Sequence, residues 1–227
     1  MSNLYIVATP IGNLQDFSPR AAEVLQSVDY IACEDTRTSG ILLKHFQIDK
    51  PTFSFHQHNE HQKVNHLINL LDGNQKVALI SDAGMPGISD PGFLATRAAH
   101  QNGHNVIVIP GPDAATTALV ASGLPCDKYV FEGFLPPKKG RQKRLKQLAE
   151  EERTLILYES PYRLVKLLDE LNKYFGPDRL AAVAKELTKK FEEVVRAPLS
   201  SLQETFGARS NIKGEYVVVI SGCNYEE

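Results

Sequence analysis

The sequence contains no tryptophan, only three cysteines and no long apolar run. The cysteines are Cys33, Cys126 and Cys223, and their wide spacing without a C-x-x-C pair argues against a disulfide framework and a zinc site. No apolar stretch approaches the length needed to span a bilayer, so a membrane protein is not expected. The N-terminus lacks a basic segment followed by a long apolar one, which argues against export. Together these absences predict a protein of the reducing cytoplasm.

Two widespread nucleotide-binding motifs are also missing. The sequence has neither G-x-x-x-x-G-K-[ST] nor a G-x-G-x-x-G that opens a helix, which disfavours a P-loop NTPase and a Rossmann dinucleotide enzyme. With 25 Lys and Arg against 27 Asp and Glu, the formal net charge is −2. The overall charge therefore gives no indication of nucleic-acid binding, and any such indication has to come from a local cluster.

In the first half of the chain, short apolar runs alternate with segments of helical periodicity. The runs at 4–8, 30–33, 77–80 and 106–109 are rich in Val and Ile and predict buried strands. One helix is expected to begin at Ser18-Pro19. A second is expected to begin after Asn59 and to end at Gly73 in a left-handed conformation, and a third to begin at Pro91 and to end at Gly103. This alternation predicts a mostly parallel sheet covered on both faces.

The pattern changes around residues 110–125, and we place a domain boundary there, with lobes at 1–112 and 113–227. Strands are expected at 129–131, 154–158, 180–184, 193–196 and 216–220, some of them antiparallel. A helix is expected to start at Ser160-Pro161 and to present one apolar stripe formed by Leu164, Leu168, Leu171 and Phe175. The sequence therefore predicts two α/β lobes that meet at a cleft.

Three loops rich in glycine and proline each follow a predicted strand, at 8–14, 81–92 and 110–119. Ligands of open α/β sheets bind at the carboxyl ends of strands, so three such loops predict a binding site. The alternative for each loop is a plain structural turn, because turns collect Gly, Pro and Asp. Asp113 is expected to cap the helix that follows it rather than to contact a ligand.

Eight long motifs occur in an order that resembles one family along nearly the whole chain. They are ATPIGNLQD, CEDTRTSGILLKHF, SDAGMPGISDPG, IPGPDAATTALVASGLP, FEGFLPPKKGRQKRL, LYESPYRL, AKELTKKFEEVVR and GEYVVVI. The chain resembles the ribosomal RNA small subunit methyltransferase I family of the tetrapyrrole methylase superfamily. The resemblance implies a homodimer of two-lobed α/β subunits that hold S-adenosylmethionine between the lobes. It also implies methylation of a cytidine ribose 2′-hydroxyl in 16S rRNA of the small ribosomal subunit.

The resemblance also assigns a cofactor pocket, where Met85 and Asp113 depart from the residues typical of the family. It implies cofactor contact by Pro10, Asp82, Ala83, Gly84, Ile88 and Ala114 from the first lobe, and by Leu187 and Glu215 from the second. Gly84 and Gly87 would let a ligand approach the main chain, while Pro86 and Pro91 would hold the loop rigid.

A ribose hydroxyl becomes a good nucleophile only as its proton leaves, so the reaction implied by the resemblance calls for a general base. The candidates are Glu34 and Asp35 in CEDTR and Glu186 in AKELT. Arg37 could bind a phosphate or orient a carboxylate. For CEDTR a second interpretation stays open, in which Asp35 or Thr36 simply caps the next helix.

Residues 138–146, KKGRQKRLK, contain six basic residues in nine positions. Given the resemblance, Lys138, Lys139, Arg141 and Arg144 are expected to contact RNA phosphates, adding salt-dependent affinity without sequence reading. The alternative is a solvated charged face, the common fate of a Lys/Arg run.

Four histidines, His56, His58, His61 and His66, lie close together in the sequence but do not predict a metal site. His61 and His66 are five residues apart and do not share a helix face, and no cysteine accompanies them. RNA contact or ordinary surface polarity is the expected role.

Two other functions of the protein stay open. One is methylation of a small porphyrinoid, since fold alone does not define the substrate. The other is binding of the cofactor or of RNA without turnover.

Overall fold

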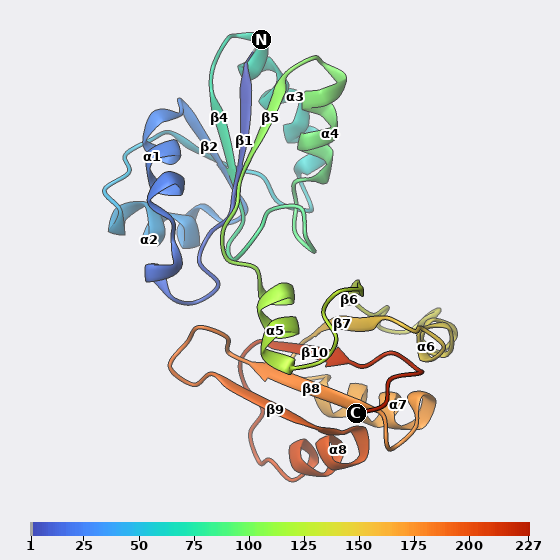
Figure 1. The fold of residues 1–227 in the computed structure, drawn as a ribbon. Helices are drawn as coiled ribbons and strands as arrows, with labels where there is room; N and C mark the ends of the chain where they lie inside the picture. Colours follow the sequence, from blue (N-terminus) through green and yellow to red (C-terminus); the bar gives the residue numbers. More distant parts are fainter. Residues whose placement is uncertain (1) are drawn as a thin grey trace. The chain divides into compact units, whose positions relative to one another are not determined.

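The computed structural model describes residues 2–227. The chain divides into two compact units, residues 1–113 and residues 114–227, each built around a five-stranded sheet (Figure 1). Among residues 2–227, every helix is too short or too polar to cross a membrane.

The N-terminal unit contains a sheet in which all neighbouring strands are parallel. Its strands are β1 (Asn3–Val7), β2 (Tyr30–Cys33), β3 (Thr52–Ser54), β4 (Val77–Ile80) and β5 (Asn105–Ile109), in the order β3-β2-β4-β1-β5. The expected parallel sheet is confirmed, with β3 as an additional short edge strand. Every residue of β4 is buried, as expected of a strand covered on both faces.

Helices cover both faces of this sheet, and each face has its own hydrophobic core. The helices are the 3₁₀ helix η1 (Leu14–Asp16) and the α-helices α1 (Pro19–Ser27), α2 (Thr36–His45), α3 (Glu60–Asp72) and α4 (Phe93–Gln101). Helices α1 and α2 pack on one face, whereas α3 and α4 pack on the other (Figure 1). Alternate residues of β4 serve the two cores: Ala78 and Ile80 face α1 and α2, while Val77 and Leu79 face α3 and α4.

Most expected helix ends are confirmed, but α4 begins at Phe93, two residues after Pro91, and the conformation at the end of α3 also differs. Ser18 caps α1 by accepting the Ala21 N–H at 3.1 Å, and Pro19 is the first helical residue. Gly73 ends α3 as expected, but with φ of −73° it is not left-handed. The left-handed residue is instead Asn74, with φ of 61°. Asparagine tolerates this conformation because its short polar side chain can bond locally.

The C-terminal unit contains a mixed sheet. Its strands are β6 (Tyr129–Phe134), β7 (Thr154–Glu159), β8 (Leu180–Lys185), β9 (Glu193–Pro198) and β10 (Tyr216–Ile220), in the order β6-β7-β10-β8-β9. Only β6 and β7 are parallel, and the other three pairings are antiparallel. The expected antiparallel strands are therefore confirmed.

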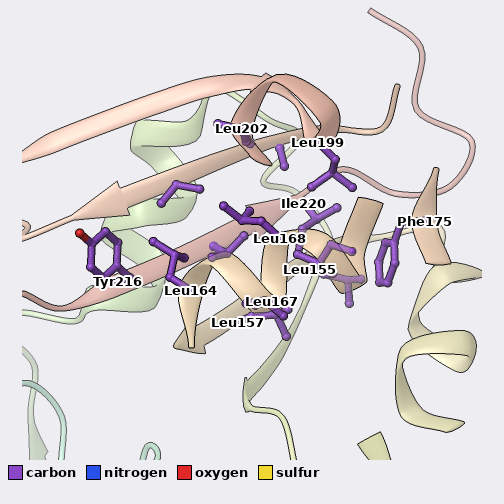
Figure 2. Close-up of a cluster of buried hydrophobic side chains, with 14 of the residues drawn as sticks. Leu155, Leu157, Leu164, Leu167, Leu168, Phe175, Leu199, Leu202, Tyr216 and Ile220 are labelled. Atoms are coloured by element: carbon purple, nitrogen blue, oxygen red, sulfur yellow. The ribbon is translucent and has the colours of Figure 1, made fainter. Parts of the chain in front are cut away.

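The main core of this unit lies between the sheet and three helices, α6 (Arg141–Ala149), α7 (Leu164–Phe175) and α8 (Leu199–Gly207). The remaining helix, α5 (Ala114–Ser122), contacts strands β7 to β10. Figure 2 shows the side chains that α7 contributes to the core, including Leu164, Leu168 and Phe175. The expected apolar stripe on α7 is confirmed. The helix begins at Leu164, later than expected, because Ser160-Pro161 opens a turn closed by the Arg163 N–H on the Ser160 carbonyl.

A buried arginine ties α6 to this core. The Arg141 side chain is 5% exposed, and its Nε donates to Glu170 at 2.7 Å. Its Nη2 lies 3.5 Å from the carboxylate of Glu159, which is 1% exposed. The same carboxylate also accepts a bond from Arg163 at 2.8 Å. A buried carboxylate needs such partners, because an unpaired charge in the interior is strongly destabilising.

We expect Arg141→Met to lower the free energy of unfolding by about 3 kcal/mol, because Glu159 and Glu170 each lose a charged partner. Urea denaturation followed by circular dichroism measures the change. Lys139→Met is the matched control: Lys139 is exposed, and its replacement should change stability by less than about 0.5 kcal/mol. Equal stability of the two variants would show that the buried ion pairs do not support the core.

Candidate active site

The three glycine- and proline-rich loops of the N-terminal unit come together at the carboxyl edge of its parallel sheet. Thr9, after β1, exchanges two main-chain hydrogen bonds with Gly84, after β4, at 2.9 and 3.1 Å. The loop after β5 joins them, because a Cβ built on Gly111 would lie 2.9 Å from the Cβ of Ala8. The carboxyl edge of an open α/β sheet is where ligands of such folds bind, so this edge is the candidate site.

The loop at 81–92 is held by hydrogen bonds between its own residues. The Ser81 hydroxyl donates to the Gly84 carbonyl at 3.2 Å, and the Gly87 N–H donates to the Pro91 carbonyl at 3.1 Å. Gly92 has φ of +146°, and a Cβ there would lie 3.0 Å from the Gly87 nitrogen, so the chain crossing requires glycine. The loop is thus preorganised, which lowers the entropy cost of binding a ligand.

Acidic side chains cluster at this edge. The carboxylate of Glu34, after β2, accepts the N–H of Asp82 at 3.3 Å, and the carboxylate of Asp82 accepts the N–H of Asp35 at 3.1 Å. Burial is the main cause of the raised pKa of Glu34 and of Asp82. Burial also raises the pKa of Asp90 to about 7, with contributions from the negative charges of Glu34 and Asp82. Perturbed carboxylates of this kind are typical of functional sites.

Asp90 is a residue that sequence reasoning missed. It belongs to the loop that the sequence singled out, and it follows Ser89, a residue with the unusual φ of 62°. The available signal was an aspartate between two conformationally special positions, Ser89 and the Pro91-Gly92 pair. That signal was not specific enough, because Asp is common in turns and its burial depends on the fold.

Asp35 caps α2, as one of the two interpretations of CEDTR expected. Its carboxylate accepts the main-chain N–H of Arg37 at 2.8 Å and pairs with the Arg37 guanidinium at 2.6 Å. These bonds lower the pKa of Asp35 to about 2. A carboxylate with so low a pKa is a weak base, so Glu34 and Asp90 suit proton removal better. The Arg37 side chain is 89% exposed and already orients a carboxylate.

The remaining expected cofactor residues of this edge differ in exposure. Pro10 is buried, whereas Asp82, Ala83 and Ile88 are exposed. Ala114, expected in the first lobe, is the first residue of α5 and belongs to the C-terminal unit. Met85 is half-buried and packs against the core under α3 and α4.

In the C-terminal unit the structure brings Glu186 and Glu215 together. The Glu186 N–H donates to the Glu215 carbonyl at 3.0 Å, and the Glu215 N–H donates to the Glu186 carboxylate at 3.0 Å. Lys189 pairs with both carboxylates, at 3.0 and 3.1 Å. Although burial opposes the effect, hydrogen bonds from Lys189 and the Glu215 N–H lower the pKa of Glu186. Leu187, next to Glu186, is buried.

The basic segment at 138–146 separates into residues with different surroundings. Lys138 and Lys139 are exposed, as are Lys143 and Lys146 of the same run, which the sequence analysis did not assign. Arg144 is partly exposed and forms a two-bond pair with Glu132, with one bond of 2.7 Å. The expectation for Arg141 is corrected, because its buried guanidinium is engaged with Glu159 and Glu170 and does not face RNA.

The histidine-rich segment has local partners. His56 contacts Asn59 at 3.1 Å, and the ring of His66 packs edge-on against Phe53 at 5.0 Å. Within residues 2–227, no group of three or more His, Cys, Asp or Glu side chains is arranged to hold a metal ion.

Comparison with known proteins identifies the family. The family model "Tetrapyrrole (Corrin/Porphyrin) Methylases" matches residues 3–203. The chain is similar to "Ribosomal RNA small subunit methyltransferase I" of Pasteurella multocida, with 51% identity over 96% of this chain and 79% of that protein. It is also similar to the protein of that name from Synechocystis, with 49% identity over 100% of this chain and 81% of that protein. The protein of that name from Escherichia coli O157:H7 is 48% identical over 99% of this chain and 79% of its own length.

Solved structures share the fold at low sequence identity. The crystal structure of the methyltransferase CobJ has a TM-score of 0.74 and 16% identity, and covers 100% of this chain and 97% of that one. The crystal structure of diphthine synthase has a TM-score of 0.73 and 14% identity, with coverage of 97% and 90%. The expected fold and family are confirmed, and the chain belongs to the tetrapyrrole methylase family.

Proposed function

We propose that this protein transfers a methyl group from S-adenosylmethionine to the ribose 2′-hydroxyl of a cytidine in 16S rRNA of the small ribosomal subunit. The observation that carries the proposal is 48–51% identity, over nearly the whole chain, to proteins named ribosomal RNA small subunit methyltransferase I. Identity of this extent spans both units and all the motifs of the candidate site. A cytoplasmic homodimer is part of the same proposal and rests on the family resemblance.

The residues of the candidate site fit S-adenosylmethionine. This cofactor carries a sulfonium and an ammonium cation, and the edge presents the carboxylates of Glu34, Asp82 and Asp90. Ala83, in the same loop, is exposed, so its main chain can be approached by a ligand. The residues that would hold the cofactor are Pro10, Asp82, Ala83, Gly84 and Ile88 of the N-terminal unit, and Ala114, Leu187 and Glu215 of the C-terminal unit.

The cofactor supplies an activated methyl group on sulfur, and the chain has two tasks. The first is positioning: holding two reactants in line can lower a barrier by about 7–11 kcal/mol. The second is removal of the hydroxyl proton, which typically adds about 10²–10⁴-fold. Glu34 and Asp90 are the preferred bases, because their raised pKa values lie closer to neutral pH than those of Asp35 and Glu186.

The basic segment supports an RNA substrate. Lys138 and Lys139 are exposed and can meet backbone phosphates, and Arg144 is partly exposed beside Glu132. Phosphate contacts hold the RNA without reading its sequence. The choice of one cytidine therefore has to come from the shape of the RNA or from contacts with bases.

The transfer of label from S-adenosylmethionine tests the reaction. Small ribosomal subunits from cells that lack this enzyme should accept one labelled methyl group on a cytidine ribose of 16S rRNA. Label on a tetrapyrrole and none on RNA would instead support the porphyrinoid alternative. Cofactor binding without transfer to either acceptor would support a binding module.

Replacing Lys138 and Lys139 by Ala should weaken binding to small subunits and reduce its dependence on salt. Each lost phosphate contact lowers the slope of log K against log salt by about 0.7 on single strands, so a change of about 1.4 is expected. Affinity measured over a salt series gives the slope. A double variant at Lys76 and Lys166 removes the same charge from other exposed positions and should keep the wild-type slope. Identical slopes in the two double variants would show that Lys138 and Lys139 do not contact phosphates.

Asp90→Asn should stabilise the protein at pH 8 and have little effect on stability near pH 4. The pKa of Asp90 is about 7 in the folded state, against about 3.9 in an unfolded chain. Between these values the folded state binds more protons, so the wild-type free energy of unfolding falls as pH rises from 4 to 7. Asparagine does not ionise, so the variant does not lose this part of its free energy of unfolding as pH rises.

Urea denaturation at pH 4.5, 6 and 8 measures the effect of Asp90→Asn on stability. Asp16→Asn is the matched control, because it makes the same substitution at an exposed position of the same unit. If Asp90 is the base, Asp90→Asn also loses about 10²–10⁴-fold in methyl transfer. A stability difference that is constant with pH would show that Asp90 is not perturbed.

A further inference from the structure

Three aromatic side chains of the C-terminal unit lie together on adjacent strands. The ring of Tyr158 on β7 lies 5.1 Å from that of Phe131 and 5.6 Å from that of Phe134, both on β6. Both contacts are edge-on, at 74° and 66°. Phe134 is directly opposite Tyr158 in the strand register. We call these three residues the aromatic cluster.

A β-bulge places both phenylalanines on the same face of the sheet. In a regular strand, residues three positions apart point to opposite faces. The register shifts between Phe131 and Gly133, so that Glu132 is the extra residue. Gly133, with φ of 68°, then pairs with Leu157, which belongs to the core under α6 and α7. The aromatic cluster therefore lies on the face opposite this core.

The aromatic cluster is open to solvent at Phe134. The Phe134 side chain belongs to an edge strand and is 53% exposed, while Phe131 and Tyr158 are half-buried behind it. The core of this unit is complete without Phe134, because Val130 and Leu135 of the same segment pack into it. An aromatic ring held by a bulge, and left half-exposed, is a surface on which another flat ring can stack.

Positive charge follows the aromatic cluster directly along the chain. Lys138 is four residues after Phe134, so the two Cα atoms are at most about 14 Å apart. Lys138 and Lys139 are both exposed. The nearest acidic side chain in the segment, Glu132, is neutralised by its two-bond pair with Arg144. The surface thus joins an open aromatic ring to unopposed positive charge.

We propose that the aromatic cluster stacks an unpaired base of the RNA substrate, with Phe134 as the contacting ring. Sites for single-stranded RNA combine aromatic platforms for bases with basic residues that follow the phosphates, and this segment supplies both. The charge next to the ring selects a nucleic acid rather than an apolar peptide. The proposal rests on the proposed function, and it adds a base contact to a segment that otherwise recognises only phosphate.

Kinetics of methyl transfer to small ribosomal subunits test the proposal. Phe134→Ala should raise KM for the subunits about tenfold, which is at the lower end of the loss typical of one stacked base. The affinity for S-adenosylmethionine and the melting temperature should stay at wild-type values. Phe134→Tyr keeps the stacking surface and should restore KM, whereas Phe134→Leu, which is apolar but not aromatic, should not.

The absence of tryptophan allows a direct observation of stacking. Phe134→Trp introduces a single tryptophan, whose fluorescence should be quenched when an eight-nucleotide cytidine RNA is added. Tyr129→Trp is the matched control, because Tyr129 is 42% exposed at the other end of the same strand. Its fluorescence should change little.

Three results would overturn the proposal: an unchanged KM in Phe134→Ala, a wild-type KM in Phe134→Leu, or equal quenching at the two tryptophan positions. A weaker affinity of Phe134→Ala for S-adenosylmethionine would also overturn it, because the ring would then serve the cofactor. These outcomes are distinct from failure of the proposed function, in which the wild-type protein transfers no methyl group to RNA.

Discussion

Two main-chain hydrogen bonds between Thr9 and Gly84 hold the carboxyl edge of the parallel sheet together. They join the loop after β1 to the loop that carries Asp82 and Asp90. These two bonds use only main-chain atoms, so the edge can be held together while it presents acidic side chains. Carboxylates can therefore be held close to one another despite their repulsion. Together with burial, that repulsion raises the pKa of Asp90 to about 7, which suits a group that must take up a proton at neutral pH.

The two units of the chain present opposite charges. The N-terminal edge is acidic, which suits a cationic methyl donor but repels the phosphates of RNA. The exposed lysines around residue 138 lie in the other unit and supply positive charge of the kind that RNA phosphates need. A net charge of −2 thus conceals two surfaces of opposite sign. For this reason the total charge of the chain gave no information about its substrate.

Sequence patterns predicted the elements better than their contacts. Runs of Val and Ile identified the strands of the N-terminal sheet, and the spacing of Leu164, Leu168 and Leu171 identified the buried face of α7, because both patterns follow directly from burial. The left-handed residue after α3 was wrongly placed at Gly73, since Gly73 and Asn74 both tolerate that conformation. Asp90 was missed because its burial depends on how distant loops meet, which no local pattern records.

The correction at Arg141 shows how a charged run can be divided by helical periodicity. Arg141, Leu145 and Leu148 occupy positions i, i+4 and i+7 of α6, and all three are buried. Lys143 and Lys146 fall outside this stripe and are exposed. The same spacing that identifies the apolar face of α6 therefore assigns Arg141 to the interior, where it needs an acidic partner. Under the proposed function, phosphate contacts fall to the lysines outside that stripe, since only a side chain that reaches solvent can release counterions when RNA binds.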